Sequence, residues 1–185
     1  MKRTYFPAGY LVILLPGLFF SCASVNAINE SPTRWGYGLT ATPGWQLGEG
    51  PTSLHLVVGY SRIKFDGGGG HNRIWEFGSQ IRYSFTKYPE NGIWLGGGAS
   101  YLNIASIADG SSGSDPHAGG FTIGPAVGYR FKIGRIPSSI YFSPSYLSRG
   151  KFEVSGNTVG ASSSGYYAKF GLDLHLMSLV HAKGR

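Results

Sequence analysis

The sequence predicts an all-β fold, a single antiparallel up-and-down transmembrane β-barrel with eight strands. Two observations lead to this fold class: apolar and polar residues alternate over long stretches, and the connectors between those stretches alternate between short and long. In residues 121–133, FTIGPAVGYRFKI, every odd position is apolar and every even position is small or polar. A period of two indicates a β-strand with two unlike faces.

The same alternation recurs in six further segments, and no segment after residue 30 has a convincing helical period. The six segments are 35–45, 53–60, 74–85, 92–105, 140–146 and 166–176. Membrane barrels of single chains have an even number of strands, so seven segments predict an eighth. The order of the loops places it at the N-terminus, within or near SVNAINESPT (24–33), although no good strand is recognisable there.

The connectors support hairpin topology. Short connectors at 47–51, 86–91 and 132–137 alternate with longer stretches rich in Gly, Ser and Asp, which are 66–72, 108–120 and 155–164. Neighbouring segments therefore form antiparallel hairpins, with short turns at one end of the barrel and long loops at the other. Transmembrane barrels show this asymmetry.

Packing decides which face points outward. The interior of an eight-stranded barrel is just wide enough for side chains, and the large apolar residues of seven or eight strands would overfill it. The apolar face therefore points outward into lipid, and the lumen receives Gly, Ser and Thr with a few long polar side chains. Aromatic residues gather near both ends of the segments, which is typical of the two aromatic girdles of a membrane barrel.

The N-terminus has the layout of a secretory signal. Lys2 and Arg3 give a positive start, an uncharged apolar stretch follows, and Val25 and Ala27 occupy the −3 and −1 positions of a signal-peptidase site. The only cysteine, Cys22, lies in this segment, so the mature chain would have no disulfide. Two alternatives remain open: a retained membrane helix, and lipidation of Cys22.

These features divide the chain into three parts. We expect a signal peptide over 1–27, an outer-membrane β-barrel over 28–176 and a C-terminal tail over 177–185. The net charge of +7 makes an anionic partner plausible. Because the cations are scattered, nucleic acid is not an expected partner.

Residues 34–176 resemble the small bacterial outer-membrane barrels, namely the OmpA transmembrane domain, OmpX, Ail, Lom and the opacity-type proteins. The resemblance rests on the strand pattern, on GFTIGPAVGYRF and on the last strand YYAKFGLDLHL. Family members usually end at a terminal aromatic residue, whereas this chain continues through MSLVHAKGR. The resemblance implies location in the outer membrane of a diderm bacterium, a monomer, contact with lipopolysaccharide and insertion by the barrel-assembly machinery.

Charged residues on the small-residue face are candidates for a network in the lumen. Buried charges must be paired, and three cations can meet two carboxylates across the barrel. We expect a structural plug of salt bridges, with a polar path for ions as the alternative. The network residues are Glu76, Arg82, Arg130, Lys169 and Asp173.

Basic residues also gather at strand ends next to the long loops. In the expected orientation they lie at the level of the outer-leaflet headgroups, where Arg can bind the phosphates of lipid A in a bidentate manner. The alternative is that they are ordinary solvated charges. The candidate lipid A residues are Arg62, Lys64, Arg73, Arg149 and Lys151.

The expected function is therefore a structural or surface-interaction role, with a narrow plugged lumen that is not an open pore. Two alternatives stay open: a lipid A-modifying enzyme of the deacylase or acyltransferase type, and an adhesin that binds host factors. A hydrolase would need a Ser activated by a His. The resemblance to barrels that deacylate lipid A would call for a His-x-Ser pair on one strand face, and none of the five histidines has it. No catalytic residue, metal site or cofactor is expected.

Overall fold

The structure is a computed structural model, and it describes residues 22–31, 34–47, 50–65, 69–86, 91–108 and 115–175. Within these ranges the chain is all-β. The strands are β1 (Cys22–Ser31), β2 (Arg34–Ala41), β3 (Gly44–Gln46), β4 (Thr52–Lys64), β5 (Gly70–Ser84), β6 (Gly92–Ala108), β7 (His117–Ile133), β8 (Ile136–Arg149), β9 (Glu153–Val154), β10 (Asn157–Thr158) and β11 (Ser163–His175). No helix among the described residues is long and apolar enough to cross a membrane.

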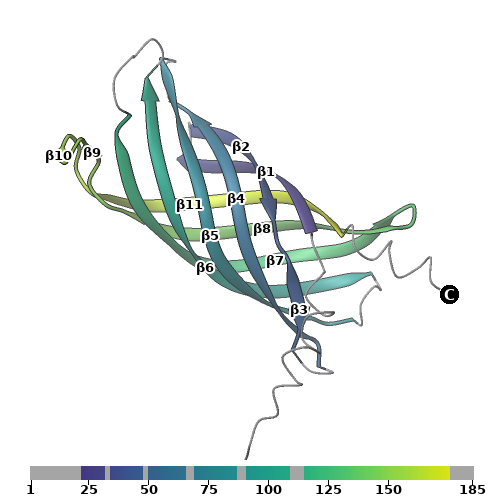
Figure 1. The fold of residues 1–185 in the computed structure, drawn as a ribbon. Helices are drawn as coiled ribbons and strands as arrows, with labels where there is room; N and C mark the ends of the chain where they lie inside the picture. Colours follow the sequence, from purple (N-terminus) through teal and green to yellow (C-terminus); the bar gives the residue numbers. More distant parts are fainter. Residues whose placement is uncertain are drawn as a thin grey trace, which may run out of the picture.

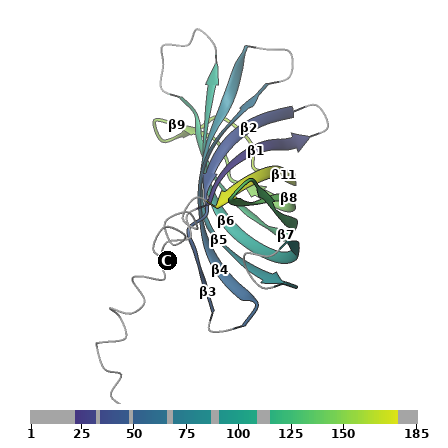
Figure 2. The same cartoon turned by 90° about the vertical axis from the view of Figure 1, so that its right-hand side faces the viewer.

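Eight of these strands form a closed antiparallel barrel (Figures 1 and 2). The order around the wall is β1, β2, β4, β5, β6, β7, β8 and β11, and β11 pairs with β1 to close it. The short β3 pairs with β4 beside β2, and β9 pairs with β10 in a hairpin that projects from one end of the barrel. The eight-stranded up-and-down topology predicted from the sequence is confirmed.

The eighth strand is β1, at the N-terminus as predicted. It pairs with β11 from Cys22↔His175 to Asn29↔Ala168 and with β2 on its other side. The expected end of the signal peptide, after Ala27, falls inside this strand. Residues 1–21 and the tail 177–185 lie outside the described residues, so the signal peptide and the tail stay predictions.

The two ends of the barrel differ in their connections. The connections of β6 to β7 (109–116) and of β8 to β11 (150–162) are long and lie at one end, which we call the long-loop end. The connection of β4 to β5 at the same end (65–69) is shorter than the connection of β5 to β6 at the other end (85–91). The prediction of a long connector over 66–72 is therefore wrong, because residues 70–72 belong to β5. The other end, the short-turn end, includes the two-residue turn between β7 and β8. Gly134 in that turn has a φ of +62°, a left-handed conformation that glycine adopts without a steric penalty.

The outer surface of the barrel is apolar. On β7, Ile123 is 54% exposed and Val127 is 41% exposed, whereas the intervening Thr122 and Ala126 are almost completely buried. Exposed aromatic rings pair near both ends: Tyr60 and Trp75 toward the long-loop end, with 5.0 Å between ring centroids, and Tyr83 and Phe85 at the short-turn end. The large apolar residues therefore point outward, in agreement with the packing argument.

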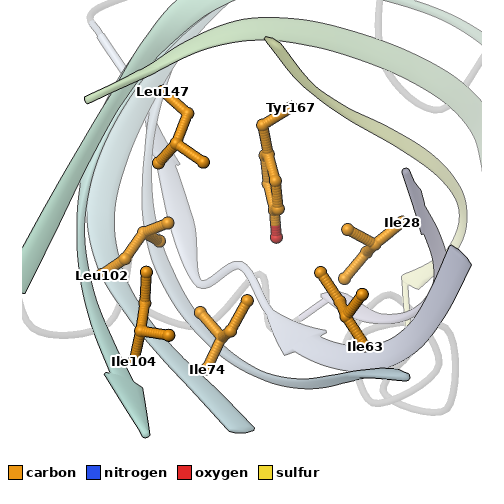
Figure 3. Close-up of a cluster of buried hydrophobic side chains, with 7 residues drawn as sticks. All are labelled: Ile28, Ile63, Ile74, Leu102, Ile104, Leu147 and Tyr167. Carbon is orange, nitrogen blue, oxygen red and sulfur yellow. The ribbon is translucent and has the colours of Figure 1, made fainter. Parts of the chain in front are cut away.

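The lumen differs from the prediction at the long-loop end. Seven apolar or aromatic side chains from six strands point inward there and pack together (Figure 3). We call this cluster the apolar collar: Ile28, Ile63, Ile74, Leu102, Ile104, Leu147 and Tyr167. Phe152, from the segment after β8, packs against it. The prediction of a lumen of small and polar residues is wrong here, because these strands carry apolar residues on both faces near the long loops.

Candidate functional site

Two ion pairs join opposite walls of the lumen below the apolar collar. Arg82 Nη1 lies 3.1 Å from Asp173 Oδ2, and Lys169 Nζ pairs with Glu76 Oε2. Both pairs join β5 to β11, which are separated by three strands on either side of the barrel. The two strands are therefore diametrically opposed, and each ion pair spans the lumen.

Arg82 is the most enclosed cation of this network. Its side chain is 6% exposed and its partner Asp173 is fully buried. The guanidinium lies over the ring of Trp94, 4.4 Å from the centroid, and its Nε donates a hydrogen bond to Gln80. These contacts hold the guanidinium in one position between a ring, an amide and a carboxylate.

Trp94 is a member of the site that sequence reasoning missed. It is 1% exposed and lies opposite Gly128 of β7 in the strand register. A Cβ at Gly128 would lie 2.4 Å from the indole ring, so only glycine leaves room for it. The sequence does contain a sign of this contact: Trp94 shares its strand face with Gly92, Gly96 and Gly98, a face that points into the lumen. In a narrow lumen a ring of that size needs a glycine on the neighbouring strand.

Arg130 lies nearer the short-turn end. It is buried, and its Nη2 donates a hydrogen bond to Ser84 Oγ at 2.6 Å. Of the five predicted network residues, Glu76, Arg82, Lys169 and Asp173 are joined in ion pairs, and Arg130 is held by a hydroxyl.

Two buried histidines each contact a serine near this end. His55 Nε2 lies 2.9 Å from Ser53 Oγ, and His175 Nε2 lies 3.0 Å from Ser139 Oγ. The pattern expected from the sequence is a His followed two residues later by a Ser. Ser53 and His55 lie on one strand face in the reverse order, so that pattern does not include them. Ser139 is 1% exposed, so its contact with His175 serves to satisfy polar groups taken out of water.

The space left between the ion pairs is small. A cavity of about 40 Å³ is lined by residues that include Glu76, Arg82, Thr122 and Lys169. That volume can hold a few water molecules and no larger ligand. No group of three or more His, Cys, Asp or Glu residues among those described could hold a metal ion. The apolar collar lies between this polar part of the lumen and the long-loop end.

The candidate lipid A residues divide into two groups. Arg62, Lys64 and Arg73 belong to the hairpin of β4 and β5, at its long-loop end. Arg149 ends β8, which is three strands away from β5 around the wall, and Lys151 follows it. Arg149 donates to Ser163 Oγ at 3.0 Å and lies over the ring of Phe152. The five residues therefore do not form one cluster, because the two strand ends lie on different sides of the barrel.

The first group forms a compact basic surface. Arg62 lies directly opposite Arg73 in the register, and Lys64 lies opposite His71. Arg62 Nη2 also donates to His71 Nδ1 at 3.1 Å. We call the three cations Arg62, Lys64 and Arg73 the basic rim, and the buried His71 lies beneath them. Like charges that face each other across a strand pair are destabilising, so the Arg62–Arg73 pair costs stability when no counter-ion lies between the two side chains.

Strand number, closure and the outward apolar face define the chain as a small up-and-down β-barrel. Among solved structures it is similar to Neisserial surface protein A (NspA), with a TM-score of 0.51 and 18% sequence identity over 84% of this chain and 94% of that chain. No family model matches the sequence, and no curated protein matches it. The likeness shows that the two proteins share a fold.

Proposed function

We propose that this chain is a small outer-membrane barrel with a closed lumen and a structural or surface-interaction role, whose basic rim binds the phosphates of lipopolysaccharide. The main observation in favour of a membrane location is the apolar outer surface of the barrel. Its large side chains are about half exposed, on strands all around the barrel. Contiguous apolar surface of this extent is stable in lipid and not in water.

Strand length supports the same location. The barrel strands β4 to β8 contain 13 to 17 residues, and 9 to 11 tilted residues suffice to cross the hydrocarbon core. The wall leaves no open edge between β11 and β1, as a lipid-embedded sheet requires. The proposed state is a monomer inserted by the barrel-assembly machinery.

The position of the basic rim supports the lipopolysaccharide proposal. Tyr60 and Trp75 are neighbours on the outer surface of the β4–β5 hairpin, and aromatic rings of this kind mark the membrane interface. Arg62 and Arg73 follow two residues further toward the long loops on the same strands. They therefore lie at headgroup level, where lipid A carries phosphates that arginine binds with charge-assisted hydrogen bonds.

The orientation can be tested by thiol labelling on whole cells. With Cys22 changed to Ser, a cysteine at Asn157 in the β9–β10 hairpin should react with a membrane-impermeant reagent. A cysteine at Arg135, in the turn between β7 and β8, should react only after the cells are lysed. Both positions are exposed in the structure. Labelling of Arg135→Cys but not Asn157→Cys on intact cells would reverse the orientation and remove the basic rim from the outer leaflet.

The rim can be tested by replacing Arg62, Lys64 and Arg73 with Gln together. Hydrogen bonds to charged groups contribute roughly 1.5–3 kcal/mol each, so lipid A binding should weaken about tenfold or more. The measurements are the lipopolysaccharide that co-purifies with the barrel and the shift of its thermal unfolding on addition of lipid A. Both should be made in low salt, where such contacts are strongest.

The matched control is the double variant Arg149→Gln/Lys151→Gln, on the other side of the barrel. It should keep the wild-type affinity for lipid A. An unchanged affinity in the triple variant, or an equal loss in the control, would refute a specific role for the rim.

A further inference from the structure

We infer that the exported chain is cleaved between Ala23 and Ser24, four residues before the boundary that the Val25-x-Ala27 pattern favours. The inference rests on the proposed export to the outer membrane. It goes beyond that proposal because it assigns a processing site from the register of the barrel.

The register shows what cleavage after Ala27 would remove. β1 has eight pairs with β11, from Cys22 to Asn29, and cleavage there would delete the first six of them. Two pairs would remain, Ile28↔Lys169 and Asn29↔Ala168. On the other side, the pairs of β1 with β2 from Ala23 to Ala27 would also be lost.

Those losses would open the barrel in the membrane. The part of β11 from Phe170 to His175 and the part of β2 from Tyr37 to Ala41 would lose their shared neighbour. Backbone groups without partners in hydrocarbon cost several kcal/mol each, which is why membrane barrels close. The exposed part of β11 includes Asp173, so the gap would also reach the ion pair with Arg82.

Cleavage after Ala23 removes only two of the eight pairs with β11 and one pair with β2. It keeps the six pairs from Ser24↔Asp173 to Asn29↔Ala168 and the contact of Ser24 with Thr40 of β2. The required small residues are present, since Ser21 lies at −3 and Ala23 at −1, directly after an apolar run that ends at Phe20. Cys22 then leaves with the signal peptide, and the mature chain has no thiol.

The first test is the intact mass and N-terminal residue of the barrel purified from outer membranes. The expected first residue is Ser24. A chain that begins at Ile28 would overturn the inference, and so would one that begins at a lipid-modified Cys22. If the processed chain is found outside the outer membrane but begins at Ser24, the proposed location fails while the cleavage site stands.

A pair of matched variants separates the two sites without depending on folding. Leucine is too large for the −1 position, so Ala23→Leu should leave most of the chain as precursor in pulse-labelled cells. Ala27→Leu should be processed like the wild type, because Ala27 then lies on the outer surface of β1 and not at the cleavage site. The reverse result, with precursor only in Ala27→Leu, would place cleavage after Ala27.

Discussion

Replacing Arg82 by methionine should lower the free energy of unfolding by about 3–5 kcal/mol. Asp173 is fully buried, and its Oδ1 has no hydrogen-bond partner among the described residues, so its charge depends on the guanidinium 3.1 Å from Oδ2. Methionine fills similar volume but leaves the carboxylate without a counter-charge. The measurement is denaturant unfolding in lipid vesicles or detergent, followed by tryptophan fluorescence.

Two controls separate charge from packing. Lys151→Met removes an exposed cation outside the strands and should change stability by less than about 0.5 kcal/mol. The double variant Arg82→Met/Asp173→Leu removes both charges, and should recover much of the loss if an unpaired carboxylate is its cause. An unchanged unfolding midpoint in Arg82→Met would show that water reaches the pair and that the lumen is not sealed.

Replacing Ile123 by lysine should cost about 2–4 kcal/mol in a lipid bilayer. Ile123 is 54% exposed in the middle of β7, where it lies between Ala99 and Tyr146 in the register. In water an exposed apolar residue can accept a lysine at little cost. In hydrocarbon the lysine loses its hydration. The loss of folding free energy therefore shows whether water or lipid surrounds this part of the barrel.

The matched control is Ile133→Lys, which is on the same strand and the same face. Ile133 is 47% exposed beside the turn at Gly134, at the short-turn end. The cost of a charge falls to about 0–1 kcal/mol near the membrane interface, so the two variants should differ clearly. Equal and small costs at both depths would mean that this surface does not lie in a bilayer.

The apolar collar lies on the long-loop side of the ion pair that the Arg82 experiment probes. The collar residue Leu102 is fully buried, and the charged pairs lie below it. Water entering from the long-loop end therefore meets an apolar layer before it can reach Arg82. The large penalty expected at Arg82 rests on the burial of its own side chain and of Asp173.

Local pattern was enough to determine several features of this protein. The period of two in residues 121–133 predicted both faces of β7, and the same alternation put Glu76 and Arg82 on the inner face of one strand. Alternation needs only neighbouring side chains to be unlike, so it can be recognised without knowing the partner strand. It did not identify β1, because the alternation there covers only Ala23 to Ala27 and breaks at Ile28, and pairing with β2 and β11 completes the strand.

Only the tertiary structure decided which residues meet. The ion pairs depend on β5 and β11 lying opposite each other, and the separation of Arg62 from Arg149 depends on how many strands lie between them. The contact of Trp94 with Gly128 and the apolar collar depend on register and on the volume available inside a closed wall. These properties arise from strand order and closure, which join residues far apart in the chain, and no local pattern encodes them.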